Sequence, residues 1–415
     1  MLTHLRGWPT AVFAALALIV AGAAPAATPH EIPAQSRRTP TTGAAVPARP
    51  LPATAPRAPA RPLPASVDGG TWRSGHLQGM ALDRTRRHLY FSFTDRLVKT
   101  DLSGRPLGSV RGIGGHLGDL DLNAADGRVY GSLEYGEDAA FYIAVFDGRR
   151  ITRMDMDART SGVLTTVHLG EVARDFTADM DADGVFDGDT GRTADHRYGN
   201  AGIDGVAFGP GFGAERGPQL LTVAYGVYAD PARRDNDHQV LLQYDVRDWK
   251  RYERPLDESR PHRSGPAGHD GKFFVHTGNT TYGVQNLEYD GHSGNWLMAA
   301  YKGTKPAFPN HGLFAVDGGR PPVAGEIRGQ RRPERGMLLS LLRQGLHHAP
   351  SGTYGWHAPG QFGLVSLDDG RFYVGESTKV RGGTATQSGR ALLHRWTGRT
   401  PMPFTALTGS VAATG

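Results

Sequence analysis

The stretch His76-Leu-Gln-Gly-Met-Ala-Leu-Asp, residues 76–83, begins a pattern that returns four more times along the chain. Each copy has polar residues and a Gly, continues as a short apolar strand, and leads through a turn into a second hydrophobic run. The other copies start at His116, Asn200, Tyr282 and Gln361. A strand–turn–strand unit that cannot bury its own faces must stack on its neighbours. The pattern therefore predicts an all-β protein with a β-propeller fold.

Further strands follow the first two in most units, so each unit has the pattern of a four-stranded propeller blade. The fourth strand is predicted at residues 151–154 in the second unit and at 249–252 in the third. Five starts predict five blades, and six or seven blades are the alternatives, because wide gaps separate the later starts. Within one gap, residues 334–346 carry Met and Leu at helical spacing and predict a helix.

The two ends of the chain differ in composition from the repeats. Residues 1–26 carry Arg6, an apolar stretch and then small residues, which is the pattern of a secretory signal peptide. Residues 27–70 are rich in Pro and Ala and predict a disordered linker. The propeller domain is then expected at 71–407, with a tail at 408–415. We expect a secreted, extracellular monomer with no stable membrane insertion after signal cleavage; a retained N-terminal anchor is the alternative.

The charge and Cys content limit the classes of partner. The chain has 46 Lys and Arg against 41 Asp and Glu, a formal net charge of +5, and no Cys. Disulfides and a lipoprotein anchor are thereby excluded. The basic residues are scattered instead of forming a stripe with interleaved aromatics, so nucleic acid is not an expected partner. The small excess of basic over acidic residues is compatible with a polysaccharide or oligosaccharide ligand, including an acidic one.

Blade geometry predicts a site at one mouth of the central channel. The first two strands of a blade are antiparallel, so the start of the first and the end of the second lie at the same end. The expected catalytic residues are His76, His116, Asp119, Asp204, Tyr282 and Glu134. The expected substrate-binding residues are Gln78, Asn200, Tyr225, Gln285, Asn286, Lys302, His357, Gln361 and Glu376. The alternative is that polar strand starts only satisfy backbone groups and hold water in the channel.

Two chemistries fit such a mouth. Two carboxyl groups among Asp119, Asp204, Glu134 and Glu376 could hydrolyse a glycosidic bond as acid and base. In the other chemistry, His76 or His116 acts as a general base, and Tyr282 or Tyr225 donates a proton. Lys302 or an Arg would then neutralise a uronate. That second layout suits β-elimination in an acidic polysaccharide.

An acidic segment in the third unit predicts a calcium site. Carboxylates at alternate positions followed by Gly184 match the start of a calcium loop, although Thr190 stands where a bidentate Glu is usual. We expect the ion to be structural, stabilising the long insertion. The expected ligands are Asp179, Asp181, Asp183, Asp187 and Asp189.

The blade pattern from His76 to Trp396 resembles that of secreted bacterial β-propeller proteins, among which carbohydrate-active enzymes are common. Resemblance to five-bladed glycoside hydrolases implies carboxylate catalysis by residues such as Asp119 and Asp204. Resemblance to propeller polysaccharide lyases implies roles for His76, His116 and Tyr282. Because the five starts carry different polar residues, one asymmetric enzyme site is favoured. A non-catalytic binding propeller and a calcium-dependent phosphoesterase are the alternatives.

Overall fold

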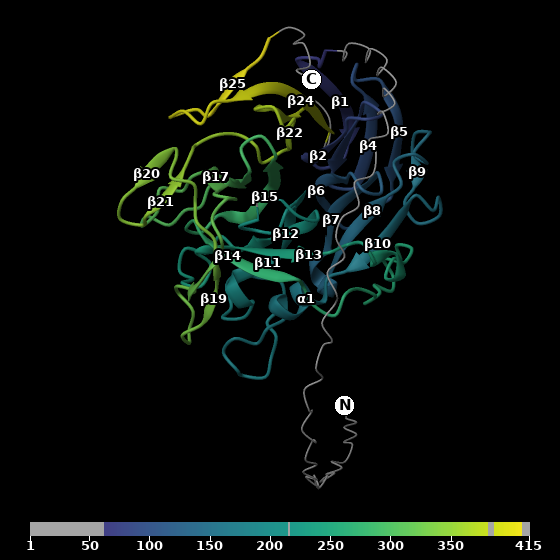
Figure 1. The fold of residues 1–415 in the computed structure, drawn as a ribbon. Coiled ribbons are helices and arrows are strands. Elements are labelled where there is room, and N and C mark those ends of the chain that lie inside the picture. Colours follow the sequence, from purple (N-terminus) through teal and green to yellow (C-terminus); the bar gives the residue numbers. More distant parts are fainter. Residues whose placement is uncertain (1–61, 215, 381–385, 409–415) are drawn as a thin grey trace, which may run out of the picture. The chain divides into compact units, whose positions relative to one another are not determined.

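The computed structural model describes residues 62–214, 216–380 and 386–408, in which five β-sheets form the blades of a propeller (Figure 1). The five-bladed prediction is confirmed. The predicted signal peptide, the linker up to residue 61 and the tail from residue 409 lie outside the described residues. Among the described residues, no helix is long and apolar enough to cross a bilayer.

From the channel outwards, the strands of the first four blades follow the order of the chain, except that the two outermost strands of blade 3 are reversed. Blade 1 contains β2 (Leu77–Asp83), β3 (His88–Phe93), β4 (Arg96–Asp101), β5 (Pro106–Arg111) and the added β9 (Met156–Asp157). Blade 2 contains β6 (His116–Asn123), β7 (Arg128–Tyr135), β8 (Ala140–Phe146) and β10 (Leu164–His168). Blade 3 contains β11 (Asn200–Gly209), β12 (Leu220–Val227), β13 (His238–Tyr244), β14 (Gly271–His276), β19 (Arg335–Leu338) and β18 (Val323–Glu326). Blade 4 contains β15 (Thr281–Asp290), β16 (Asn295–Tyr301) and β17 (Leu313–Val316).

The fifth blade joins the two ends of the propeller. It contains β22 (Leu364–Ser366), β23 (Arg371–Lys379), β24 (Thr386–Trp396), β25 (Phe404–Ala406) and β1 (Ser66–Arg73). The N-terminal strand β1 pairs antiparallel with β24, so an early and a late segment share one sheet (Figure 1). Since β1 begins at Ser66, the domain starts before the predicted residue 71, and the end of the predicted linker is a strand.

Short helices and a hairpin lie in the connections between strands. They are α1 (Gly170–Phe176), the 3₁₀ turns η1 (Gly136–Asp138), η2 (Arg197–Gly199) and η3 (Trp249–Arg251), and the hairpin β20 (Leu346–His348) with β21 (Thr353–Gly355). Two predicted fourth strands are wrong: residues 151–154 form no strand, and 249–252 contain η3. Their places are taken by β10 and β14, which lie further along the chain inside or beside the insertions.

The helix predicted at 334–346 is also wrong. This segment begins as β19, which pairs in parallel with β14 through Phe273 and Met337. Its leucines pack against three separate hydrophobic clusters: Leu338 against one between blades 2 and 3, Leu341 against one between blades 3 and 4, and Leu342 against one between blades 4 and 5. An extended chain can reach three clusters in so few residues, whereas a helix would direct these side chains to one face.

Glycines in the repeated strand starts bring the inner strands together. A Cβ on Gly79 in blade 1 would lie 2.5 Å from the Cα of Asp119 in blade 2, and one on Gly118 would lie 2.3 Å from Asp204 Oδ1 in blade 3. One on Gly363 in blade 5 would lie 2.7 Å from the side chain of Met80 in blade 1. The recurring Gly thus serves the close approach of neighbouring blades around the channel.

Candidate active site

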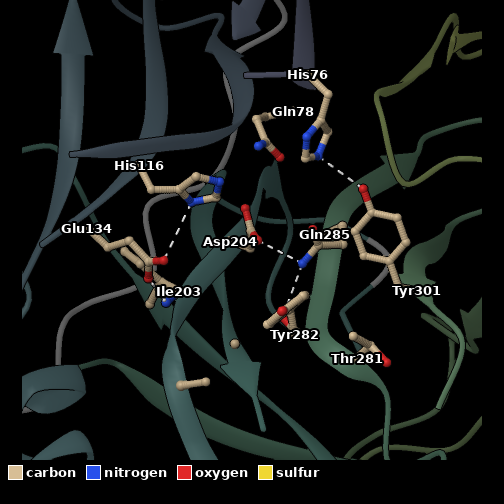
Figure 2. A pocket seen from close by; sticks show the side chains of 12 residues that line it. His76, Gln78, His116, Glu134, Ile203, Asp204, Thr281, Tyr282, Gln285 and Tyr301 are labelled. Carbon is tan, nitrogen blue, oxygen red and sulfur yellow. Dashed lines mark hydrogen bonds and ion pairs between the residues drawn. The ribbon is translucent and has the colours of Figure 1, made fainter. Parts of the chain in front are cut away.

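A cavity of about 530 Å³ opens where the inner strands of blades 1 to 4 begin (Figure 2). We call it the mouth cavity. It is lined by His76, Gln78, His116, Glu134, Ala201, Ile203, Asp204, Gly226, Thr281, Tyr282, Gln285 and Tyr301. Seven of these were expected from the sequence, namely His76, Gln78, His116, Glu134, Asp204, Tyr282 and Gln285. Its volume lies in the range of small-ligand sites.

His116 and Glu134 form a charged pair on one wall. His116 starts β6 and Glu134 is near the end of the neighbouring β7, so strand pairing brings them opposite each other. Nδ1 of His116 lies 3.5 Å from Oε1 of Glu134, and the other carboxylate oxygen accepts the backbone N–H of Ile203 at 3.0 Å. Burial disfavours the charged imidazolium, but the carboxylates of Glu134 and Asp204 outweigh this and raise the pKa of His116 to about 9. His116 is therefore protonated at neutral pH.

Asp204 lies deeper, at the bottom of the cavity. Its Oδ2 accepts a hydrogen bond from Nε2 of Gln285 at 2.7 Å, while its Oδ1 is buried without a hydrogen-bond partner (Figure 2). Burial, reinforced by the charge of Glu134 and opposed by His116, raises the pKa of Asp204 to about 7. The carboxyl group therefore changes its charge within the physiological range.

His76 and Tyr301 face each other on the opposite wall. Nε2 of His76 lies 3.1 Å from the Tyr301 hydroxyl oxygen, and the rings of His76 and Phe362 make a T-shaped contact with centroids 5.5 Å apart. Burial and the charge of His116 lower the pKa of His76 below its ordinary value of 6.5. Burial and the charge of Asp204 raise the pKa of Tyr301. At neutral pH the wall therefore presents a neutral imidazole beside a protonated phenol.

Tyr282 stands at the rim with its side chain exposed. It adopts a left-handed φ of 64°, which is strained for a residue with a side chain, and it is 61% exposed. Its carbonyl oxygen accepts a hydrogen bond from Gln285 at 3.1 Å, which ties the strained turn to the residue that holds Asp204. An exposed aromatic ring at a cavity entrance can stack on the apolar face of a sugar.

Two expected site residues instead link the inner strands. Asp119 is fully buried, and its carboxylate accepts backbone N–H groups of Val206, Leu287 and Leu120 at 2.9–3.0 Å. Burial raises the pKa of Asp119 well above its ordinary value, against the opposing effect of these donors. The amide of Asn286 donates to the carbonyl oxygens of Gln78 and Gln361. Both side chains therefore join blades beneath the mouth and are not part of the cavity lining.

The other expected residues outside the cavity have structural contacts of their own. Asn200 donates to the carbonyl oxygen of Val172, and buried Tyr225 donates to Asp175. The Gln361 side chain accepts the N–H of Gly360, and Glu376 pairs with Arg390 on the surface. Lys302 and His357 are exposed and do not line the cavity.

Tyr301 is the ionisable lining residue that was not expected from the sequence. It is the last residue of β16, next to Lys302, the residue expected at the end of that strand. Neighbouring residues of a strand point to opposite faces, so an error of one residue places the wrong side chain in the site. The ends of the second strands lie at the channel mouth, so this geometry selects Tyr301 once β16 is known to end there. Ala201, Ile203, Gly226 and Thr281 contribute mainly to the shape of the wall and carried no signal.

The acidic insertion brings three of its five predicted ligands together. Asp179, Asp181 and Asp183 are exposed, and one carboxylate oxygen from each lies within 4.8 Å of the others. Asp187 and Asp189 are outside this group; the Asp189 carboxylate instead accepts the hydroxyl of Tyr228. The loop therefore offers a three-carboxylate cluster in place of the predicted five.

Comparisons with known proteins add little to this geometry. No protein-family model matches the chain, and no curated protein matches it. The chain is similar to Saccharomyces cerevisiae Sqt1, with 10% identity and a TM-score of 0.28 over 79% of this chain and 59% of Sqt1. It is also similar to the β-propeller domain of Myceliophteria thermophila Cps50 (Swd1), at 10% identity and a TM-score of 0.26 over 75% and 82% of the two chains. It is similar to the Dos1 propeller at 9% identity and a TM-score of 0.28, over 76% of this chain and 78% of the Dos1 chain.

Proposed function

We propose that this protein is a secreted polysaccharide lyase that cleaves an acidic glycan by β-elimination at the mouth cavity. The observation that supports this most strongly is the contrast between its two histidines. His76 is neutral beside a protonated tyrosine, and His116 is cationic across the cavity. Elimination next to a uronate carboxylate needs a neutral base, a proton donor and a positive charge, and the cavity walls hold all three.

The proposed reaction proceeds through His76 and Tyr301. A ring nitrogen of His76 takes the proton from the carbon beside the uronate carboxylate, and that electron pair forms a carbon–carbon double bond. The bond from the adjacent ring carbon to the glycosidic oxygen breaks, and the Tyr301 hydroxyl gives its proton to the leaving oxygen. The 3.1 Å contact between the two side chains then lets Tyr301 regain a proton from His76. Each group thus returns to its starting charge.

The opposite wall and the rim would hold the substrate. His116 places a positive charge where a carboxylate can be neutralised, and Glu134 keeps that charge on the ring. Neutralising the carboxylate makes the neighbouring carbon–hydrogen bond more acidic, since the negative charge formed on proton removal is stabilised. Tyr282 at the entrance would stack on a sugar ring. Binding and proton transfer are therefore assigned to different walls.

Glycoside hydrolysis is the second candidate because two carboxyl groups line the same cavity. Asp204, with its pKa raised to about 7, would be the general acid, and Glu134 would be the second carboxylate. Against this, both groups have other contacts: Glu134 is held by His116 and Ile203, and Asp204 is held by Gln285. Elimination instead assigns proton transfer to His76 and Tyr301, whose side chains contact each other directly.

Product analysis on acidic and neutral polysaccharides tests the proposal. A lyase acting on polygalacturonate, alginate or a glycosaminoglycan would generate unsaturated ends that absorb in the near ultraviolet. Hydrolysis would generate reducing ends without that absorbance. Binding with neither product would leave a non-catalytic propeller and would refute both enzymatic proposals.

The pH dependence of cleavage should separate the two chemistries. For elimination, His76 must be neutral and His116 protonated. As the pH increases, activity should therefore first rise, at a pH below 6.5, because His76 loses its proton. It should then fall as the pH increases through about 9, because His116 loses its proton. A hydrolase that needs protonated Asp204 would instead lose activity through about pH 7. Glu134→Gln keeps an oxygen for the Ile203 N–H but removes the charge, so it should move the alkaline limb to lower pH. An alkaline limb that stays in place in this variant would contradict the role given to the pair.

We also propose that the three-carboxylate cluster binds a structural calcium ion. An ion bound by the folded state alone stabilises it by mass action, so calcium should raise the melting temperature by several degrees and chelation should reverse this. Asp181→Asn should abolish the calcium effect. The matched control Asp187→Asn, which changes a carboxylate outside the cluster, should retain it. An equal calcium response in both variants, or none in the wild type, would refute this site.

A further inference from the structure

A second hollow lies beside the outer strands of blade 3. It consists of two adjoining cavities of about 530 and 510 Å³, which share His276, Arg328 and Ser351 in their linings. We call it the side groove. Its walls come from the outer strands of blade 3, the hairpin β20–β21, and loops that follow β12 and β16. It is lined by none of the residues of the mouth cavity.

The side groove carries an excess of positive charge. Six Arg and Lys side chains line it, against the two carboxylates Glu326 and Asp237. Lys305 pairs with Asp237. Arg320, Arg328 and Arg343 are exposed, and in the part of the chain that the structure describes no carboxylate lies within ion-pair distance of them. These three guanidinium groups, together with that of exposed Arg234, thus remain available to an anionic ligand.

A buried histidine of the groove lining also has a polar atom without a partner. His238 lines it and is only 2% exposed, and its Nδ1 has no hydrogen-bond partner. Burial and the charges of His276 and Arg328 lower its pKa to about 3, so the ring is neutral. A buried nitrogen without a hydrogen bond is costly, and a bound polar ligand is one way to satisfy it. This observation is independent of the surface charge.

One wall offers a flat aromatic surface. The rings of His347 and Tyr354 on the hairpin stack face to face, with centroids 4.3 Å apart and planes 12° from parallel. Both rings line the groove. A stacked pair held by a hairpin presents a rigid platform for a sugar ring.

Chain connectivity relates the side groove to the mouth. The loop that carries Asp237 follows β12, and Gly226 of that strand lines the mouth cavity. The loop that carries Lys305 follows β16, whose last residue is Tyr301. Both loops therefore leave the same end of the propeller at which the mouth cavity opens, and they lead outwards to the groove.

We propose that the side groove binds a second stretch of the acidic polysaccharide, with carboxylate or sulfate groups at Arg320, Arg328 and Arg343. The identity of the ligand rests on the proposed function; the anionic chemistry comes from the groove itself. A glycan is favoured over single-stranded nucleic acid because two carboxylates lie among the cations and His347 and Tyr354 form a single stacking platform.

Binding measured in a His76→Ala background tests this without turnover. The probes are polygalacturonate, heparin, neutral dextran and oligothymidine. Removing three exposed charge contacts with R320Q/R328Q/R343Q should weaken polygalacturonate or heparin binding about tenfold, since an exposed charge pair typically contributes a factor of about two. The control R153Q/R159Q/R399Q makes the same charge change at exposed sites outside the groove and should bind like the parent. Melting temperatures of both variants should match the parent.

Three results would overturn the side-groove proposal: equal weakening in both triple variants, no binding of either acidic probe, or oligothymidine binding as tightly as the glycans. Failure of the lyase proposal gives a different result. In that case the wild type forms no unsaturated product, while the R320Q/R328Q/R343Q variant still loses affinity relative to the control.

Discussion

Replacing His76 by alanine should lower the rate of polysaccharide cleavage by about 10²- to 10⁴-fold, the usual contribution of a positioned general base. The side chain lies 3.1 Å from Tyr301 and is kept neutral by burial and by the charge of His116. Initial rates of near-ultraviolet product formation measure the effect. Affinity for the uncut glycan should change far less, because His116 and Tyr282 are assigned to binding.

The control for this variant is His357→Ala. His357 was also expected in the site, but it is exposed and does not line the mouth cavity. Its replacement should leave cleavage unchanged. If the His76→Ala variant cleaves the polysaccharide at a near-normal rate, as the His357→Ala variant should, His76 is not the general base. The proposed elimination would then be refuted.

Asp119→Ala should destabilise the propeller strongly, although Asp119 was expected to be catalytic. Its carboxylate joins three blades by accepting backbone N–H groups of Leu120, Val206 and Leu287. A buried donor left without a partner costs about 1–3 kcal/mol, so losing these three bonds should lower the free energy of unfolding by about 3–9 kcal/mol. Denaturant unfolding followed by fluorescence measures this loss.

Asp119→Asn is the matched variant for that experiment. It keeps one acceptor oxygen, so the loss of stability should be smaller, and activity per folded molecule should stay near that of the wild type. Asp119→Asn with normal stability but no activity would show instead that Asp119 takes part in catalysis.

The contrast between Asp119 and Asp204 shows where sequence reasoning stops. Asp119 follows Gly118 and Asp204 follows Ile203, at similar places in the repeated pattern. Asp119 nevertheless holds blades together, whereas Asp204 lines the cavity. Both strands change register near their starts, between Leu117 and Leu120 and between Ile203 and Val206. Such irregularities redirect side chains, and no feature of the repeat marks where they occur.

The repeated units were predictable because their signals are local. Alternating apolar residues and turn glycines lie within each hairpin, and the same glycines are required where neighbouring inner strands approach. The closing strand β1 and the outer strands β10 and β14 depend on pairing across long stretches of chain. The helix predicted at residues 334–346 is wrong for the same reason, since β19 is fixed by its pairing with β14.

Nuclear magnetic resonance titration of ¹⁵N-labelled histidine rings tests the central claim most directly, namely that the mouth cavity holds a neutral and a cationic histidine. His76→Gln and His116→Gln variants assign the two signals. We expect His116 to remain protonated at neutral pH and to titrate near pH 9, and His76 to stay neutral until the pH falls below 6.5. If both rings titrate together near pH 6.5, the charge contrast is absent and the proposed elimination has no basis.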